Sequence, residues 1–191
     1  MNITLLSGNP KQDGLCQSVI DAAIRGAKAG GVSVSEIRLC DSRLIRCQVC
    51  DDGWGTCRDQ NICSFGSDGF TQIQTSLKQA DVLIFATPVY WGETSEALKS
   101  FLDRLRRCEF GSQGALSGKQ ALLIASAGGS GNGIITCLHQ LEQFCRHTDM
   151  AIFDRFGINR WNHDYQAPAI ESAARALAEG RVCGETIQLE N

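Results

Sequence analysis

Residues 82–104 read VLIFATPVYWGETSEALKSFLDR, and this stretch contains the pattern that decides the fold. It opens with a short apolar run at 82–86, which is followed by a polar turn that contains a proline. From position 95 onward, apolar residues recur every three or four positions, which is typical of an amphipathic helix. A buried strand, a turn and a helix in this order form the first part of a βαβ unit, so the sequence predicts a parallel sheet.

The same unit recurs along the chain, because each of five strand-like runs is followed by helix-compatible sequence. We expect strands at 3–6, 32–39, 82–86, 121–125 and 151–156. We expect helices at 15–28, 70–79, 95–107, 134–147 and 167–179. Right-handed crossovers between them predict an α/β, flavodoxin-like three-layer sandwich with a five-stranded parallel sheet in the order 2-1-3-4-5. A six-stranded dinucleotide-binding sheet is the competing fold, and it needs the tail at 186–189 as a strand.

Length and composition are consistent with one such domain. The chain has 191 residues, so we expect residues 1–191 to form a single domain, with a Cys-rich insertion at about 40–68. The formal net charge of −3 argues against a nucleic-acid-binding protein, which normally has a basic surface. No apolar run approaches the roughly 18 residues of a membrane span, and the N-terminus lacks a signal-peptide pattern. We therefore expect a cytoplasmic protein that does not contact a membrane.

Three loops of the predicted sheet should meet at its C-terminal edge, where open α/β sheets bind their ligands. The loop at 7–18 is polar and leads into a helix, so its backbone N–H groups suit a single phosphate group. The loop at 87–94 places Tyr90 and Trp91 where they can stack on a flat ring. Glycines in the loop at 126–133 allow a flat molecule to approach the backbone. The alternatives for the three loops are a plain turn, a cap of the core and a flexible connector.

These motifs resemble those of the flavodoxin-like, NAD(P)H-dependent FMN reductases over about residues 1–160. The string SGNPKQDGLCQS at 7–18 is similar to that family's phosphate loop. TPVYWGETSEALKSFLDR at 87–104 is similar to its isoalloxazine loop and the following helix, and 127–133 resembles the third FMN contact region. The resemblance implies FMN as the cofactor, with contacts from Ser7, Asn9, Lys11, Cys16 and Ser18 near the phosphate, Pro88, Val89, Tyr90, Trp91 and Gly92 beside the ring, and Ala127, Gly128 and Gly129 at its pyrimidine edge.

The phosphate loop departs from the family's usual pattern. Asn9 stands where serine is usual, Lys11 where arginine is usual, and Cys16 where a hydroxyl is common. Lysine offers a point charge instead of a bidentate fork, and a thiol is a weaker donor than a hydroxyl. We therefore expect a lower phosphate affinity than the family norm.

Ten cysteines are many for a chain of this length, and four of them cluster. Cys47, Cys50, Cys57 and Cys63 are separated by two, six and five residues. Four thiolates can hold a [4Fe–4S] cluster or a tetrahedral zinc ion, and free thiols are the third alternative. The set resembles that of the iron–sulfur flavoprotein branch, although its middle gap is longer. We expect the scattered cysteines to be small buried hydrophobes, because disulfides are rare in a reducing compartment.

No catalytic side chain is predicted, because the sequence contains no recognisable Ser-His-Asp or paired-carboxylate arrangement; the chemistry is expected to belong to the cofactor. The resemblance implies an enzyme that passes electrons from NAD(P)H through FMN to a quinone-like or other small acceptor, with a [4Fe–4S] cluster as a further carrier. It also implies a homodimer or homotetramer. A non-catalytic electron carrier for a protein partner is one alternative, which the mild net charge disfavours. A flavin-free thiol or zinc module is another, which the aromatic loop at 87–94 disfavours.

Overall fold

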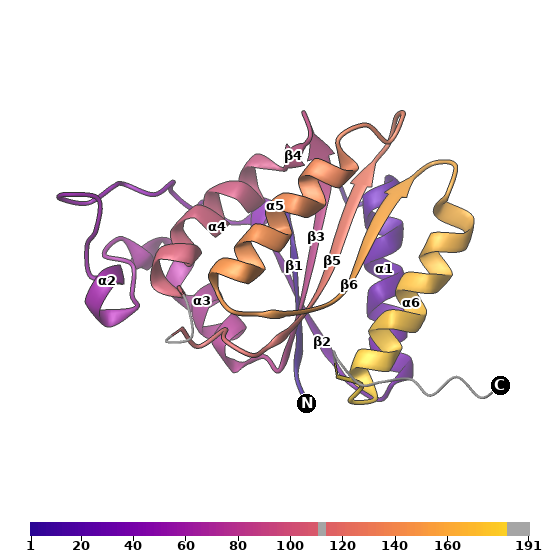
Figure 1. Cartoon of the computed structure of the whole chain (residues 1–191), viewed down its shortest axis with the longest axis horizontal. Helices are drawn as coiled ribbons and strands as arrows, with labels where there is room; N and C mark the ends of the chain where they lie inside the picture. The colour runs from indigo at the N-terminus through magenta and orange to yellow at the C-terminus, as the bar shows by residue number, and fades with distance from the viewer. Residues whose placement is uncertain (111–113, 183–191) are drawn as a thin grey trace.

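The computed structural model describes residues 1–110 and 114–182, which form one sheet between two layers of helices (Figure 1). Five parallel strands lie in the order β2-β1-β3-β5-β6. Their bounds are β1 Ile3–Ser7, β2 Val34–Arg38, β3 Val82–Tyr90, β5 Gln120–Ala127 and β6 Ala151–Asn159. This is the flavodoxin-like order that the sequence predicts, so the fold prediction is confirmed. The tail at 186–189, the sixth strand of the competing fold, lies outside the described residues.

A two-residue strand that the sequence did not indicate follows β3. This strand, β4 (Glu93–Thr94), pairs antiparallel with the end of β3 and forms a hairpin whose turn is Trp91-Gly92. The assignment of residues 87–90 to a loop was therefore wrong. Those residues continue β3, because β5 pairs with it as far as Pro88 and β4 pairs with it beyond that point.

Helices cover both faces of the sheet (Figure 1). Their bounds are α1 Gly14–Ala29, α3 Phe70–Gln79, α4 Glu96–Cys108, α5 Ile134–His147 and α6 His163–Ala178. Helix α6 begins four residues before the predicted position, because Pro168 lies in its second turn and not in its first. Strand β2 is shorter than predicted, since Leu39 turns into the core within the 3₁₀ helix Leu39–Asp41.

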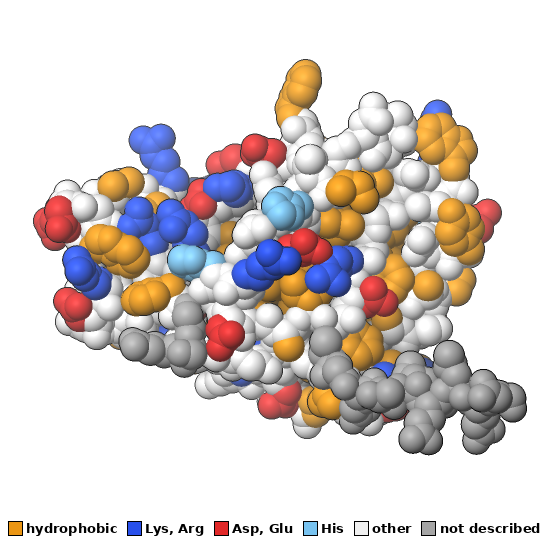
Figure 2. Space-filling view, viewed as in Figure 1, with side chains coloured by type: hydrophobic (Ala, Val, Ile, Leu, Met, Phe, Trp, Pro, Cys, Tyr) orange, Lys and Arg blue, Asp and Glu red, His pale blue; other side chains and the backbone are white. Residues whose placement is uncertain are grey.

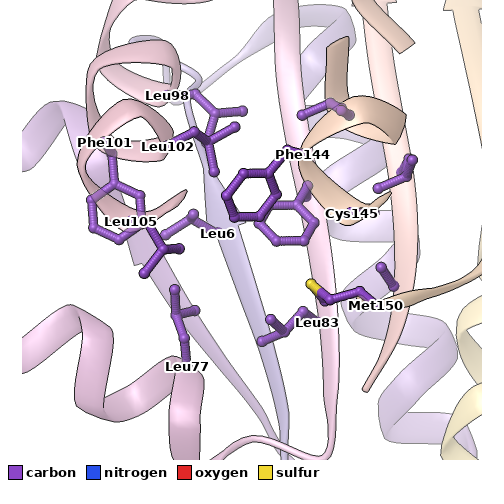
Figure 3. Close-up of a cluster of buried hydrophobic side chains, with 14 of the residues drawn as sticks. Leu6, Leu77, Leu83, Leu98, Phe101, Leu102, Leu105, Phe144, Cys145 and Met150 are labelled. Carbon is purple, nitrogen blue, oxygen red and sulfur yellow. The ribbon is translucent and has the colours of Figure 1, made fainter. Parts of the chain in front are cut away.

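Apolar side chains fix α3, α4 and α5 on one face of the sheet. Leucine and phenylalanine side chains from α3, α4 and α5 converge on those of β1 and β3 (Figure 3). The rings of Phe85 and Phe144 meet edge to face, with centroids 5.8 Å apart. Burial of one such side chain contributes about 2 kcal/mol. Helix α4 is thus held rigidly, with its first turn near the C-terminal edge of the sheet.

The Cys-rich segment between β2 and α3 projects beside α4 (Figure 1). It contains only short elements, the helix α2 (Cys57–Gln60) and the 3₁₀ helix Gly66–Asp68. None of the helices within residues 1–110 and 114–182 has the length and apolar character that a bilayer span requires.

Candidate functional site

Buried polar side chains mark the carboxyl ends of the central strands. Ser7 at the end of β1 and Thr87 in β3 are fully buried, and Ser126 in β5 is nearly so. The N–H of Ser95 donates a 3.0 Å hydrogen bond to the Thr87 hydroxyl, which joins β3 to the start of α4. Ser126 hydrogen bonds to the thiol of Cys16 on α1. The ends of β1, β3 and β5 therefore meet the starts of α1 and α4, as the sequence predicts.

The loop between β1 and α1 keeps its shape through its own side chains. Asn9 is buried, and its Nδ2 donates to the carbonyl oxygen of Lys11 at 2.8 Å. Arg38, at the end of β2, donates to the same carbonyl oxygen at 3.1 Å. Asn9 thus holds the loop in position, while the Lys11 side chain is exposed to solvent.

The first turn of α1 presents backbone donors toward this loop. The N-cap residue Asp13 makes no side-chain hydrogen bond to the helix, and the first four N–H groups of a helix lack partners within it. Burial raises the pKa of the Cys16 thiol to about 11, although Ser126 and Arg38 lower it. The thiol is therefore protonated at neutral pH and able to donate. The hydroxyl of Ser18, in contrast, lies 2.9 Å from Nε2 of His163 on α6.

The turn of the β3–β4 hairpin is strained at its tip. Trp91 and Gly92 have φ of 53° and 80°, a pattern of the type I′ turn, for which Asn-Gly is the preferred sequence. A tryptophan in the left-handed region costs about 1–3 kcal/mol. Its side chain is fully exposed and Tyr90 is half exposed, and Figure 2 shows a hydrophobic group projecting from the surface above β4. A strained and exposed aromatic residue indicates a functional surface.

Close glycine contacts join this hairpin to the loop after β5. A Cβ on Gly133 would lie 2.5 Å from Cα of Gly92, so only glycine permits this approach. Thr136 Oγ1 donates to the carbonyl oxygen of Gly92 at 2.8 Å. A Cβ on Gly128 or Gly129 would meet nothing within 4 Å. One half of the glycine-rich loop, which follows the buried Ala127 of β5, is therefore packed against the hairpin, and the other half faces open space.

The four clustered cysteines line a single cavity beside α4. Cys47, Cys50, Cys57 and Cys63 all border this cavity, together with Arg104, Arg107 and Cys108. Within the described residues, no three His, Cys, Asp or Glu side chains are placed to hold one metal ion. In a [4Fe–4S] cluster each cysteine binds a different iron, so its thiolates need not converge on one point. The four thiols thus share one cavity without converging on a single point.

Other groups near the cavity differ in exposure. Asp51 and Asp52, within the longer middle gap, are exposed and do not border the cavity. Cys108 is fully buried. Burial raises the pKa of its thiol to about 12, and the neighbouring Cys57 and Cys63 add to this shift.

Arg104 of α4 ties the Cys-rich segment to the domain. It is almost fully buried, and its Nη1 lies 2.7 Å from a carboxylate oxygen of Asp68. Nη1 also donates to the carbonyl oxygen of Ile45, and Nη2 lies 3.3 Å from Sγ of Cys63. Burial raises the pKa of Asp68, but hydrogen bonds from Arg104 and the backbone outweigh it and lower the pKa below its usual value.

Arg107, one turn further along α4, also connects this helix to the Cys-rich segment. It donates to the carbonyl oxygen of Gly53, and its guanidinium lies 4.9 Å from the ring centroid of Trp54. Sequence reasoning missed both arginines. The sequence did contain one indication. Arg104 lies three residues after the apolar Phe101, and this spacing puts it on the buried face of α4.

A groove beside α4 connects the aromatic hairpin with the cysteine segment. Tyr90, Trp91 and Cys47 line the same groove, together with Ser100 and Asp103 of α4. The two parts of the site that the sequence predicts separately are therefore neighbours along one surface.

Comparisons with known proteins agree with this geometry. Residues 1–163 match the family model of NADPH-dependent FMN reductases. An iron–sulfur flavoprotein from Methanosarcina thermophila is 35% identical over 136 residues, which are 70% of this chain and 66% of that protein. The chain thus matches just under two thirds of that relative's length. An iron–sulfur flavoprotein from Methanocaldococcus jannaschii is 28% identical over 144 residues, which are 75% of this chain and 71% of that protein.

A solved structure shares the fold. The NAD(P)H:quinone oxidoreductase from Methanothermobacter marburgensis superposes with a TM-score of 0.68 at 16% identity, over 95% of this chain and 99% of that one. The resemblance identified from the motifs at 7–18 and 87–104 is confirmed by the family match. The chain is similar to iron–sulfur flavoproteins, and it belongs to the NADPH-dependent FMN reductases, a family of FMN-dependent oxidoreductases.

Proposed function

We propose that the chain binds FMN at the C-terminal edge of its sheet and passes electrons from NAD(P)H to a quinone-like or other small acceptor. The observation that carries this proposal is the close contact of Gly92 with Gly133 at the C-terminal edge of the sheet. The same edge of the sheet carries the N–H donors of the first turn of α1, an exposed aromatic face and an open stretch of glycine backbone. A molecule with one phosphate and one flat ring suits these features.

The phosphate is assigned to the loop at 7–18 and the first turn of α1. Backbone N–H groups there and the dipole of α1 favour an anion. The Cys16 thiol adds a donor, and Lys11 adds a positive charge from the exposed side of the loop. Asn9 acts indirectly, because it keeps the carbonyl oxygen of Lys11 turned into the loop.

The flavin ring is assigned to the space between the hairpin tip and the open half of the glycine-rich loop. Trp91 and Tyr90 offer aromatic faces, while Pro88 and Val89 continue β3 beneath them. The exposed backbone at Gly128–Gly129 is able to donate to the pyrimidine edge, where negative charge develops on reduction. FMN, when bound, supplies the hydride-accepting chemistry.

We further infer a [4Fe–4S] cluster on Cys47, Cys50, Cys57 and Cys63. Support comes from the single cavity that these thiols share, and from the buried Nε groups of Arg104 and Arg107, which lack hydrogen-bond partners in the described residues. Buried N–H groups are rarely left unpaired, and an anionic sulfur cluster accepts from them. A cluster, when bound, supplies one-electron transfer.

The remaining parts of the proposal concern partners and location. Trp91 and Cys47 line one groove, and an acceptor bound in this groove would be within reach of both proposed redox groups. A cytoplasmic location is consistent with the nine described cysteines, which are all free thiols. We expect a homodimer or homotetramer, as the resemblance implies, and light scattering on the purified protein measures this.

Anaerobic purification followed by a visible spectrum tests the proposal. Flavin bands with equimolar FMN are expected, and broad absorption toward the red is expected from the cluster. Stopped-flow mixing with NADH or NADPH should bleach the flavin. Failure to bind FMN, even in excess, overturns the proposal, whereas a flavin that NAD(P)H does not bleach leaves the electron-carrier alternative.

A matched pair of variants tests the cluster. Cys63→Ser should lose most of the iron and sulfide. Cys40→Ser alters an exposed thiol outside the cavity and should keep both. Equal iron in the two variants would contradict the assignment of the four cysteines.

A further inference from the structure

All charged side chains that border the cavity of the four cysteines are positively charged. Arg46, Arg104 and Arg107 are among the residues that border it, and none of those residues is acidic. Arg104 is balanced by Asp68, as its ion pair shows. Arg107 forms no ion pair with a carboxylate in residues 1–110 and 114–182. Its positive charge is therefore unbalanced beside the thiols.

Two of these arginine side chains also have a buried N–H group without a hydrogen-bond partner in the described part of the chain. The Nε atoms of Arg104 and Arg107 are buried, and neither has a hydrogen-bond partner among the described residues. Nη2 of Arg104 already lies 3.3 Å from Sγ of Cys63. Donors of this kind next to thiolate sulfur are among the features that tune iron–sulfur potentials.

We propose that Arg104 and Arg107 set the reduction potential of the cluster by donating to its sulfur atoms and by compensating its charge. This inference rests on the proposed cluster. One-electron reduction adds one negative charge to the cluster and breaks no bond. Positive charge nearby stabilises the reduced form more than the oxidised form, and so raises the potential.

The two arginines differ in how many other interactions they make with the Cys-rich segment. Arg104 is bound to Asp68 and to two backbone carbonyl oxygens of the segment, so its removal also detaches the segment. The side chain of Arg107 donates to the carbonyl oxygen of Gly53 and lies over the ring of Trp54, and it has no carboxylate partner within 4 Å among the described residues. Arg107 is therefore the better residue to test.

The experiment is an anaerobic redox titration of the loaded protein, with dithionite as reductant and the reduced cluster followed by electron paramagnetic resonance. Arg107→Gln should lower the ratio of reduced to oxidised cluster about tenfold at a fixed potential, which is a 59 mV shift to more negative values. Arg106→Gln is the control. It removes the same charge from the adjacent position, but Arg106 is half exposed, faces Asp103 and does not border the cavity. We expect its ratio to stay within about twofold of the wild type.

Arg107→Lys provides the conservative variant. It keeps the charge but not the planar fork of donors, so its ratio should lie between those of the wild type and Arg107→Gln. Iron, sulfide and FMN content verify that each variant is loaded. If Arg107→Gln does not bind the cluster, the titration of Arg107→Lys tests the inference instead. A ratio of reduced to oxidised cluster in Arg107→Lys that equals the wild-type ratio then overturns the inference.

The outcomes separate the two levels of the proposal. A wild-type protein that binds no cluster under anaerobic conditions refutes the cluster itself. A loaded wild type whose potential is matched by Arg107→Gln refutes only the role of the arginines.

Discussion

The hydroxyl of Thr136 donates a 2.8 Å hydrogen bond to the carbonyl oxygen of Gly92, and thereby joins the first turn of α5 to the tip of the β3–β4 hairpin. The same hydroxyl lies 2.9 Å from the carbonyl oxygen of Gly133, so one side chain serves both loops. Because Trp91 directly precedes Gly92, this bond holds the backbone that carries the exposed aromatic side chain. The contact links the start of a helix to the proposed flavin surface.

Thr136→Val should weaken FMN binding about fivefold, because a lost hydrogen bond of about 1 kcal/mol loosens the hairpin. Fluorescence titration of the FMN-free protein measures the change. Thr75→Val is the control, since Thr75 makes a similar 2.8 Å bond within α3, away from the edge of the sheet. Wild-type affinity for FMN in both variants would show that the hydrogen bond between Thr136 and Gly92 does not shape the flavin site.

Two glycine substitutions should affect different properties, one the stability of the protein and the other its FMN occupancy. Gly133→Ala should lower the free energy of unfolding of the FMN-free protein by roughly 1–3 kcal/mol, because its φ is 82° and its Cβ would meet Gly92. Gly129→Val should leave that stability nearly unchanged but lower FMN occupancy, because its side chain enters the space assigned to the ring. Urea unfolding and flavin absorbance measure the two properties. Unchanged FMN content in Gly129→Val would argue against this loop as a contact.

Trp91→Asn should stabilise the protein and impair its chemistry. Asn-Gly is the preferred type I′ turn, so the FMN-free variant should gain about 1 kcal/mol in free energy of unfolding. Loss of the aromatic face should slow reduction of the flavin by NAD(P)H in a stopped-flow experiment. Trp91→Tyr, which keeps an aromatic ring and the strained backbone, should retain most of the rate. A variant series in which rate does not depend on the ring would exclude this role.

The ion pair of Asp68 with Arg104 makes attachment of the Cys-rich segment dependent on pH. The pKa of Asp68 is lowered in the folded protein, so its stabilisation is fully present above the unfolded value of about 3.9 and is lost as pH falls through the folded value. Asp68→Asn should therefore be less stable than the wild type at neutral pH, and the difference should begin to shrink below about pH 4. Urea unfolding at neutral and acid pH measures it.

The control for this prediction is Asp52→Asn, which alters an exposed carboxylate of the same segment. It should match the wild type at neutral pH. A stability difference between Asp68→Asn and the wild type that is equal at both pH values would show that the charge of Asp68 is not responsible.

Hydrophobic periodicity was sufficient to place most elements. Helices α3 and α5 begin and end where the sequence predicts, because each has an uninterrupted apolar face. Periodicity could not reveal β4, whose two residues pair only because Trp91 accepts a left-handed backbone. It also could not distinguish the arginines of α4 from solvated charges, since their partners come from a segment without periodic pattern. The FMN contacts and cluster ligands named from the sequence stay predictions.

Helix α4 connects the proposed flavin site with the proposed cluster site. Ser95 at its start is bonded to Thr87 below the proposed flavin, and Arg104 holds the cysteine segment nine residues later, about 14 Å along the axis. Electron transfer between the two proposed sites would therefore depend on a distance that the length of this helix sets. The extended gap between Cys50 and Cys57 can vary without altering that span.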